Sequence, residues 1–312
     1  MRQTRARLFH GDNLRCAARL QKEGVTFDLL YVDPPFGVGV VHGARTRVGE
    51  ARASKTSPAY DDGWRGIERF LESLKARVMA MKALLSPRGT LYLHLDHRAV
   101  HEAKVLCDSV LGRDAFRGEI VWSPGNGARS RRTWGATHQT ILIYTDDARA
   151  SPTKPRWIFH ADDAALREPY AAISSARHFR VREGEGDDGA RVRERTVQLA
   201  SGPKTYRYDL SRGRRLGTVW SDAPSMSANT PLSRETTGYP HQKPEKLLER
   251  IVRASSDEGS LVGDLFCGSG TTLAVALKHE RRAIGCDQSA LSIETTRKRL
   301  AALGVDVDVE AV

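Results

Sequence analysis

The sequence predicts an α/β protein with a doubly wound, mostly parallel sheet that a large insertion interrupts. Strand-like apolar runs alternate with helical periodicity over residues 5–144, and the same pattern resumes after residue 242. The stretch between them is rich in Arg, Gly, Ser and Pro and shows neither period. We therefore expect residues 1–147 and 236–312 to form two halves of one domain, and residues 148–235 to form an inserted region.

The first half is expected to open with a strand at residues 5–10 and a helix at 14–22. Residues 27–33 form a nearly continuous apolar run, which is typical of a strand buried on both faces, and two prolines end it. Residues 37–60 have neither period and are interpreted as a long mobile loop, which in a compact domain is usually functional or disordered. The spacing then predicts a helix over 64–85, ended by residues 86–89, a strand over 90–95, a helix over 97–111, and strands over 119–122 and 139–144.

The insertion is expected to be rich in β-structure, because Arg191, Arg193 and Arg195 alternate as they would on one face of a strand. After it the pattern predicts a helix over residues 244–254, a strand over 260–264 and a helix over 271–279. A strand over 282–287 and a closing helix over 289–303 follow.

The charge balance favours a polyanionic partner. The chain has 49 Lys and Arg against 38 Asp and Glu, a net charge of +11. Nucleic acid is the first candidate and an anionic membrane surface the second, although an Arg-rich, GC-biased genome would give the same excess. No apolar run is long enough to span a membrane, the N-terminus lacks the apolar core of a secretory signal, and the four cysteines form no Cys-x-x-Cys pair. We expect a cytoplasmic protein without a structural metal.

A glycine-rich turn, Phe266-Cys267-Gly268-Ser269-Gly270-Thr271-Thr272, lies between a predicted strand and helix. Such turns let a ligand approach the backbone. The third glycine of a dinucleotide fingerprint and the lysine of a phosphate-binding loop are both missing, so no polyphosphate is specified. Asp287 ends the next strand, where it could accept hydrogen bonds from two ribose hydroxyls. An adenosine ligand without phosphates, such as S-adenosylmethionine, fits this pattern; a tight turn without a ligand is the alternative.

The tetrapeptide Asp33-Pro34-Pro35-Phe36 ends the apolar strand. A carboxylate at the carboxyl end of such a strand is where α/β proteins place chemistry, although a plain Pro-Pro turn would look the same. The side chain of Asp33 and the carbonyl of Pro34 could both accept hydrogens from one amino group, and Phe36 offers a face on which a base could stack. This arrangement would promote direct attack by an exocyclic base amine on a sulfonium methyl group. The base would have to leave the duplex first.

The two motifs together resemble the amino-group DNA methyltransferases. The Asp33 tetrapeptide precedes the glycine turn, as in the circularly permuted β group of that family. The segments 60–64, 89–96, 118–122, 138–144 and 238–244 are similar to other motifs of the family. The resemblance implies a Rossmann-like methyltransferase fold with a seven-stranded sheet and an inserted target recognition region.

Carried over by position, the resemblance assigns base binding and catalysis to the Asp33 tetrapeptide. Asp12 would lie near the cofactor's adenine, and Asp287 would hold its ribose. The implied cofactor site comprises Asp12, Asp33, Lys243, Pro244, Asp264, Phe266, Cys267, Gly268, Ser269, Gly270, Thr271, Thr272, Asp287 and Gln288. The resemblance also implies double-stranded DNA as substrate, a nucleoid location, and room for a homodimer and a cognate restriction endonuclease.

The target amine is expected to be N6 of adenine, because the family favours Asp at position 33 for adenine and Ser for cytosine N4. Phe36 departs from the Tyr that is frequent there, so cytosine N4 stays open. An RNA methyltransferase and an inactive DNA-binding protein of this fold are weaker alternatives. No Pro-Cys dipeptide is present, which disfavours methylation at carbon 5 of cytosine.

Overall fold

The computed structural model describes residues 5–35, 41–47, 54–61, 66–125, 127, 130–145, 156–170, 180–186, 189–226 and 235–312. The chain divides into two compact units. The larger comprises residues 1–159 and 218–312, and the smaller comprises residues 160–217. In the described part of the chain, no helix combines the length and the apolarity that crossing a membrane requires.

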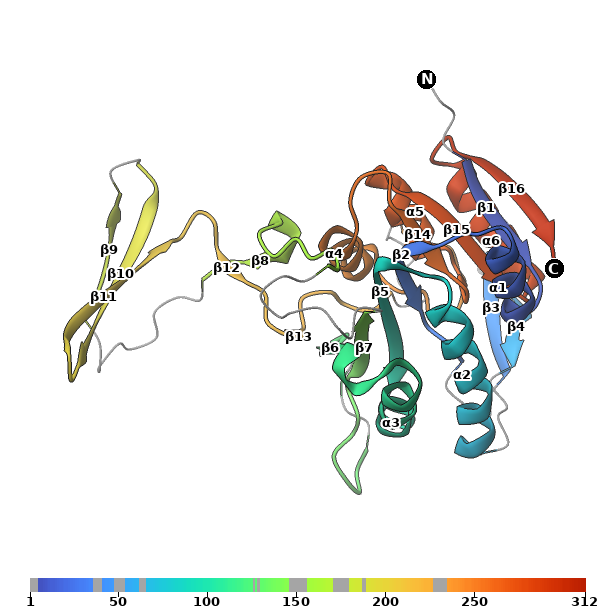
Figure 1. Ribbon diagram of the computed structural model, residues 1–312, viewed down its shortest axis with the longest axis horizontal. Helices are drawn as coiled ribbons and strands as arrows, with labels where there is room; N and C mark the ends of the chain where they lie inside the picture. Colours follow the sequence, from blue (N-terminus) through green and yellow to red (C-terminus); the bar gives the residue numbers. More distant parts are fainter. Residues whose placement is uncertain are drawn as a thin grey trace. The chain divides into compact units, whose positions relative to one another are not determined.

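The larger unit is built on a nine-stranded sheet (Figure 1). Its strands are β1 (Arg5–His10), β2 (Phe27–Val32), β5 (Leu85–Asp96), β6 (Phe116–Trp122), β7 (Gln139–Thr145), β13 (Val219–Trp220), β14 (Leu261–Asp264), β15 (Arg282–Asp287) and β16 (Asp306–Ala311). Their order is β13-β6-β7-β5-β2-β14-β15-β1-β16. Only β7 runs antiparallel to its neighbours. Strand β14 from the C-terminal half therefore lies beside β2 from the N-terminal half.

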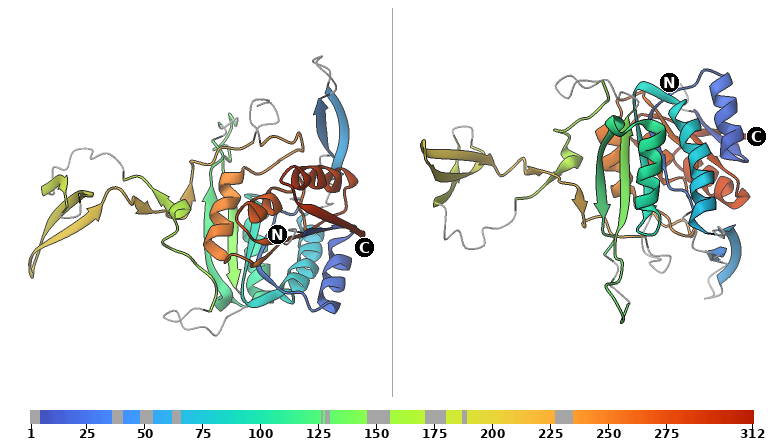
Figure 2. Two further views of the ribbon diagram at one scale, coloured as in Figure 1. Left: turned by 90° about the horizontal axis from the view of Figure 1, so that it is seen from above. Right: turned by 60° about the horizontal axis from the view of Figure 1, so that its bottom comes forward.

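Helices cover both faces of this sheet (Figure 2). They are α1 (Asn13–Lys22), α2 (Ile67–Lys82), α3 (Val100–Leu111), α4 (Glu245–Ser255), α5 (Thr271–Lys278) and α6 (Ala290–Ala301), with a short 3-10 turn, η1 (Arg113–Ala115), before β6. The first three helices pack on one face and the last three on the other, and each face has its own buried apolar cluster. Because helices cover both faces of β2, nearly all of its side chains are buried, which explains its continuous apolar run.

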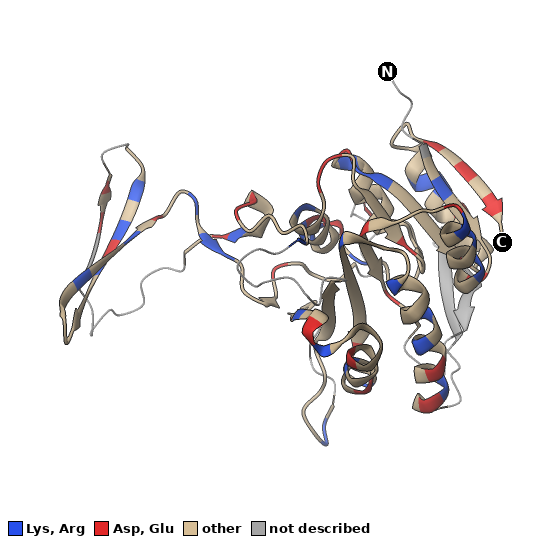
Figure 3. Cartoon of the chain, viewed as in Figure 1, with Lys and Arg blue, Asp and Glu red and all other residues tan. Residues whose placement is uncertain are grey.

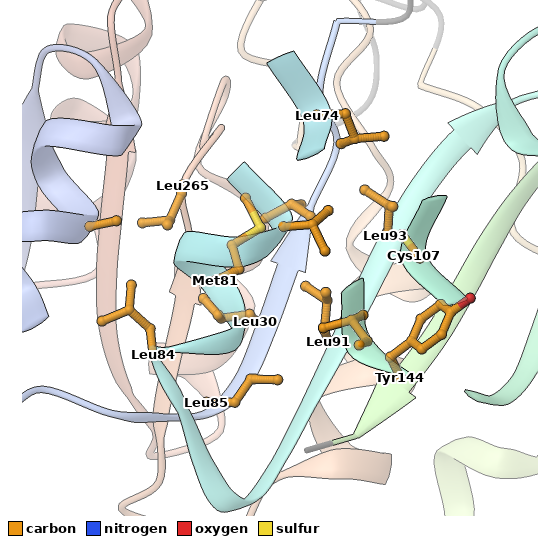
Figure 4. Packing of buried hydrophobic residues seen from close by; sticks show 14 of the residues in the cluster. Leu30, Leu74, Met81, Leu84, Leu85, Leu91, Leu93, Cys107, Tyr144 and Leu265 are labelled. Atoms are coloured by element: carbon orange, nitrogen blue, oxygen red, sulfur yellow. The ribbon is translucent and has the colours of Figure 1, made fainter. Parts of the chain in front are cut away.

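The cluster beneath α2 and α3 packs against β2. Leu30 of β2 packs in it with Leu91 of β5, Met81 of α2 and Cys107 of α3, all less than 2% exposed (Figure 4). Because these side chains pack closely against it, β2 is buried up to Val32, the residue that precedes Asp33.

The smaller unit is a set of short antiparallel strands. β9 (Arg180–Glu185), β10 (Arg191–Leu199) and β11 (Gly202–Asp209) form one sheet; β8 (Arg167–Glu168), which follows the 3-10 turn η2 (Ala164–Leu166), pairs with β12 (Arg214–Arg215). Lys and Arg are spread along these strands (Figure 3). Several are paired: Arg193 Nη2 lies 2.8 Å from Glu183 Oε1, and Arg214 Nη2 lies 2.8 Å from Glu168 Oε1. The expectation of β-structure in the insertion is confirmed, over a narrower range than residues 148–235.

Two expectations about the N-terminal half were wrong. Residues 37–60 contain an antiparallel pair, β3 (Val41–Arg47) and β4 (Ser54–Asp61), rather than a structureless loop. The backbone pairing of two strands needs no apolar alternation, so no pattern in this segment indicated it. Residues 86–89, expected to end the helix, lie within β5, and that helix ends earlier, at Lys82. Leu85 pairs with Phe27, and a register shift follows before the next pair. This irregularity accommodates Pro87 within the strand.

The chain also closes on a strand, β16, and not on the helix over 289–303. Asp306, Asp308 and Glu310 alternate there with Val307 and Val309, a period of two that the sequence interpretation passed over. The sheet exceeds the expected seven strands because β13 and β16 extend its two edges.

Gly263 is a point where the sheet tolerates no side chain. A Cβ there would lie 2.6 Å from Leu30 Cδ2 and from Phe27 Cε1. We predict that Gly263→Ala lowers the free energy of unfolding by about 1–3 kcal/mol through overpacking, measured by urea denaturation. The control is Gly127→Ala, where nothing lies within 4 Å; it should change stability by less than about 0.5 kcal/mol. Equal effects of the two variants would contradict this packing argument.

Candidate active site

A cavity of about 490 Å³ opens at the carboxyl edge of the sheet. The residues that follow β2, β14 and β15 line it, together with the segment that leads into α4. Its volume lies within the range of about 300–1,000 Å³ that is usual for ligand sites. The strand order explains the location, since β2 and β14 are neighbours and their carboxyl ends meet there.

Most of the residues predicted from the sequence lie at this cavity. Asp33, Pro34 and Pro35 line it, whereas Phe36 lies outside the described residues. The predicted cofactor residues that line it are Lys243, Asp264, Phe266, Cys267, Gly268, Ser269, Thr271, Thr272, Asp287 and Gln288.

Three other predicted cofactor residues do not line the cavity. Asp12 caps α1 by accepting a hydrogen bond from Leu14 N at 2.9 Å. Pro244 is the N-cap residue of α4. Gly270 has a φ of 72° at the start of α5, and a Cβ there would lie 2.6 Å from Thr296 Cγ2. Each of these residues shapes the backbone beside a residue that does line the cavity.

Asp287 is fixed by two backbone amides. Gly268 N donates to its Oδ2 at 2.9 Å, and Ser289 N donates to its Oδ1 at 2.8 Å. Burial raises the pKa of Asp287, and these two hydrogen bonds oppose that shift. The carboxylate is thereby held between the glycine turn and α6, with its remaining lone pairs available to hydroxyl donors.

Asp264 is almost completely buried, at 3% exposure. It accepts hydrogen bonds from Phe266 N at 3.0 Å and from Thr272 Oγ1 at 2.6 Å. Burial raises the pKa of Asp264 to about 7, and the negative charges of Asp33 and Asp287 contribute to the rise. A cationic ligand that enters the cavity would therefore favour the ionised form of Asp264.

Asp33 forms an ion pair with Lys243 through Oδ2. Its Oδ1 is buried and has no hydrogen-bond partner among the described residues; the same holds for Oδ1 of Asn13, another cavity residue. Buried acceptors without partners are costly, so the cavity favours a ligand that donates hydrogen bonds. Its carboxylates also favour a cationic ligand and repel phosphates, which fits the sulfonium and ammonium of S-adenosylmethionine.

Sequence reasoning missed a polar row beside Asp33. Tyr31 Oη lies 2.7 Å from His94 Nδ1, and His94 Nε2 lies 2.8 Å from Gln139 Oε1. The signal was present: residues 92, 94 and 96 are polar at every second position of a strand otherwise composed of Leu. A second missed feature is the exposed loop before β7, with Arg131, Arg132 and Trp134; Trp134 is 98% exposed.

A mostly parallel sheet with a cavity lined by carboxylates at its carboxyl edge is typical of α/β enzymes that bind a nucleoside-type cofactor. The family model for N6 and N4 methyltransferases, described as DNA methylase, matches residues 27–298. The chain belongs to this family, and its expected Rossmann-like methyltransferase fold is confirmed.

Individual relatives agree with this assignment. The chain is 27% identical to the type II methyltransferase M.EcaI of Enterobacter cloacae, over 93% of this chain and 68% of the relative. It is 26% identical to the DNA adenine methyltransferase YhdJ of Escherichia coli, over 94% and 82%. The fold is similar to M1.HpyAVI in complex with SAM (TM-score 0.54, 17% identity, 95% and 98% covered) and to the cytosine-N4-specific PvuII DNA methyltransferase (TM-score 0.54, 14% identity, 98% and 95% covered).

Asp264 predicts a pH dependence of cofactor binding. Its raised pKa of about 7 means that the free protein holds a proton there at acidic pH, and a cationic ligand favours the carboxylate. Binding should release this proton, so the affinity for S-adenosylmethionine should increase by up to about tenfold per pH unit below pH 7 and level off above it. Isothermal titration calorimetry at several pH values measures the slope.

The matched control for this dependence is Asp264→Asn, which keeps an acceptor oxygen but cannot titrate. Its affinity should vary little between about pH 5.5 and pH 7.5. A slope in this variant as steep as in the wild type would show that another group carries the dependence.

Proposed function

We propose that the protein transfers a methyl group from S-adenosylmethionine to N6 of adenine in duplex DNA. The observation that carries the proposal is the Asp33 carboxylate, which presents a buried, unpartnered Oδ1 at a cavity shared with Asp264 and Asp287. Asp33 is thus suited to a base amine, and Asp264 and Asp287 are suited to a cationic nucleoside. Direct methyl transfer requires both in one cavity.

The cofactor, when bound, supplies an electrophilic methyl group on a sulfonium whose sulfur keeps the bonding electrons. Asp287 is held in place to accept hydrogen bonds from the ribose, and the glycine turn offers its backbone to the methionine part. Asp264 supplies the buried negative charge that a sulfonium or an ammonium stabilises. The site would favour the cation over its neutral product, which also promotes product release.

Asp33 would act on the amine of the flipped base. Its Oδ1 would accept one amine hydrogen and the carbonyl of Pro34 the other; both residues line the cavity. Held in this way, the amine nitrogen becomes more tetrahedral and its lone pair is freed to form the new N–C bond. The amine proton that is lost on methylation passes to the Asp33 carboxylate or to water.

Adenine is favoured as target because the chain carries Asp at position 33 and aligns over most of its length with YhdJ, whose name specifies adenine. Cytosine N4 is the second candidate, favoured by Phe36 and by the similarity in fold to the PvuII enzyme. The same contacts of Asp33 serve either amine.

For duplex DNA we propose two contact regions. The inserted region, residues 148–235, would be the target recognition region, and its exposed arginines suit contacts to phosphate and guanine. The loop with Arg131, Arg132 and Trp134 would contact the duplex next to the flipped base, since it precedes the cavity residue Gln139. We also propose that the protein acts at the bacterial nucleoid, forms a homodimer and works beside a cognate restriction endonuclease. These proposals are in line with the type II relatives.

The assignment predicts the methylated nucleoside. The protein is incubated with labelled S-adenosylmethionine and duplex genomic DNA, which is then digested to nucleosides and separated by chromatography. The label should appear in N6-methyl-2′-deoxyadenosine and not in N4-methyl-2′-deoxycytidine. Sequencing that detects modified bases would then map the recognition site. Recovery of N4-methylcytosine alone would replace adenine by the second candidate, and equal labelling of structured RNA would refute the DNA assignment.

Asp33→Ala separates chemistry from cofactor binding. The variant loses the acceptor for the amine, so methyl transfer should fall by at least about 1,000-fold, a size typical of losing a preorganised electrostatic contact in a site. Affinity for S-adenosylmethionine should change by less than about tenfold, because Asp264 and Asp287 remain. Turnover close to the wild-type rate in single-turnover assays would rule out the proposed role of Asp33.

A further inference from the structure

Three polar residues form a row across the sheet on the face that carries Asp33. Tyr31 lies two residues before Asp33 on β2, His94 lies on β5 and Gln139 begins β7. The strand registers place the three on one face, since Tyr31 pairs with Tyr92 and Gln139 pairs with Asp96. Tyr31 and Gln139 both line the cavity, and His94 is fully buried between them.

The direction of the hydrogen bonds in this row follows from the protonation states. Burial raises the pKa of Tyr31 well above its usual value, so the phenol keeps its hydrogen. Burial, together with the charge of Lys243, lowers the pKa of His94 to about 3, although the charge of Asp33 opposes this shift. The imidazole is therefore neutral and has one donor and one acceptor nitrogen.

Only one arrangement satisfies the buried tyrosine. Tyr31 Oη has no other hydrogen-bond partner among the described residues, so its hydrogen goes to His94 Nδ1. The imidazole hydrogen is then on Nε2 and is donated to Gln139 Oε1. This fixes the carboxamide with its oxygen toward the imidazole and its nitrogen away from it.

The Nε2 amide of Gln139 is consequently left with two hydrogens to donate. It forms no hydrogen bond with any residue that the structure describes, and the side chain lines the cavity. Tyr31, Gln139 and Asp33 line the same cavity, and Asp33 follows Tyr31 by two residues. A donor and an acceptor, neither with a partner among the described residues, thus both belong to the lining of this cavity.

We propose that Gln139 contacts the target base by donating a hydrogen bond to the ring nitrogen next to the methylated amine, while His94 and Tyr31 are positioning residues that orient it. The inference rests on the proposed function of the site. Adenine presents N1 as an acceptor beside its amine, and cytosine presents N3 in the same relation. Guanine and thymine carry a hydrogen on the corresponding nitrogen and would face Gln139 donor to donor.

The contact therefore selects the class of base that Asp33 can methylate. Asp33 accepts from an amine and Gln139 donates to its neighbour, so the pair matches the donor-acceptor edge of an amino base and mismatches the edge of a keto base. A mismatched base would leave polar groups unpaired in the cavity, which costs more than a missing contact.

The test is a double-mutant cycle between protein and DNA. Single-turnover rates are measured for wild type and Gln139→Met on a duplex that carries the mapped site, with either adenine or 1-deazaadenine at the target. The analogue keeps the amine but replaces N1 by CH. On adenine, Gln139→Met should be roughly ten- to hundredfold slower than wild type. On the analogue, the two proteins should agree within about threefold, since the contact is absent from both.

A loss of equal size on adenine and on the analogue would overturn the proposal. Misfolding of the variant cannot imitate the expected result, because the adenine-to-analogue ratio is taken within one protein sample. Gln139→Glu, assayed at alkaline pH so that its carboxyl is ionised despite the neighbouring carboxylates, adds a second readout: it keeps the oxygen that accepts from His94 but has no hydrogen to donate. It should discriminate as poorly as Gln139→Met, and full discrimination by this variant would contradict a donor role.

Tyr31→Phe tests the positioning residues. Without the phenol hydrogen, the imidazole can adopt either tautomer, and the carboxamide can rotate with it. The variant should show an adenine-to-analogue ratio between those of wild type and Gln139→Met. A ratio equal to that of the wild type would exclude orientation through Tyr31.

Failure of the proposed function remains distinguishable from failure of this inference. If wild type methylates cytosine instead of adenine, the cycle is run with 3-deazacytosine, and its outcome still decides the role of Gln139. If wild type methylates adenine but the cycle shows no coupling, only the role of Gln139 is lost.

Discussion

The removal of carboxylates from water is the constraint on which the site depends. Asp33, Asp264 and Asp287 line one cavity; burial is the main cause of the raised pKa of Asp264, and the charges of Asp33 and Asp287 add to it. Lys243 offsets part of this charge by pairing with Asp33. A cationic cofactor completes the compensation, so the free protein is electrostatically prepared for a sulfonium and unfavourable to a phosphate.

This cluster exists only because the sheet joins the two halves of the chain. Asp33 comes from β2, whereas Asp264 and Asp287 end β14 and β15, more than 200 residues later in the sequence. Adjacent pairing of β2 with β14 puts the residues proposed for catalysis and for cofactor binding at one edge of the sheet. The permuted order of motifs along the chain is compatible with the fold because strand neighbourhood, and not sequence order, sets the cavity.

The sequence allowed most of this arrangement to be predicted, because periodicity reports burial and motifs mark the strand ends. The apolar run before Asp33 and the glycine turn before α5 both identified cavity residues. Edge strands were harder: β16 is largely exposed, and β3 and β4 lack an apolar pattern. Asp12 and Gly270 were assigned to the cofactor site from their positions in the motifs. In the structure Asp12 caps α1, and Gly270 leaves room for the close approach of Thr296. Gln139 was missed because its orientation depends on partners on two other strands.

The polar row also limits what His94 can do chemically. A histidine next to a reacting amine would ordinarily be considered as a general base. Here its free lone pair accepts from Tyr31, its hydrogen is committed to Gln139, and burial keeps its pKa near 3. It can neither take up the amine proton nor donate one near neutral pH. The proton must therefore leave through Asp33 or water, and His94 serves as a rigid spacer between a tyrosine and an amide. A spacer on a central strand holds that amide more accurately than a loop would, which is what discrimination between an acceptor and a donor nitrogen requires.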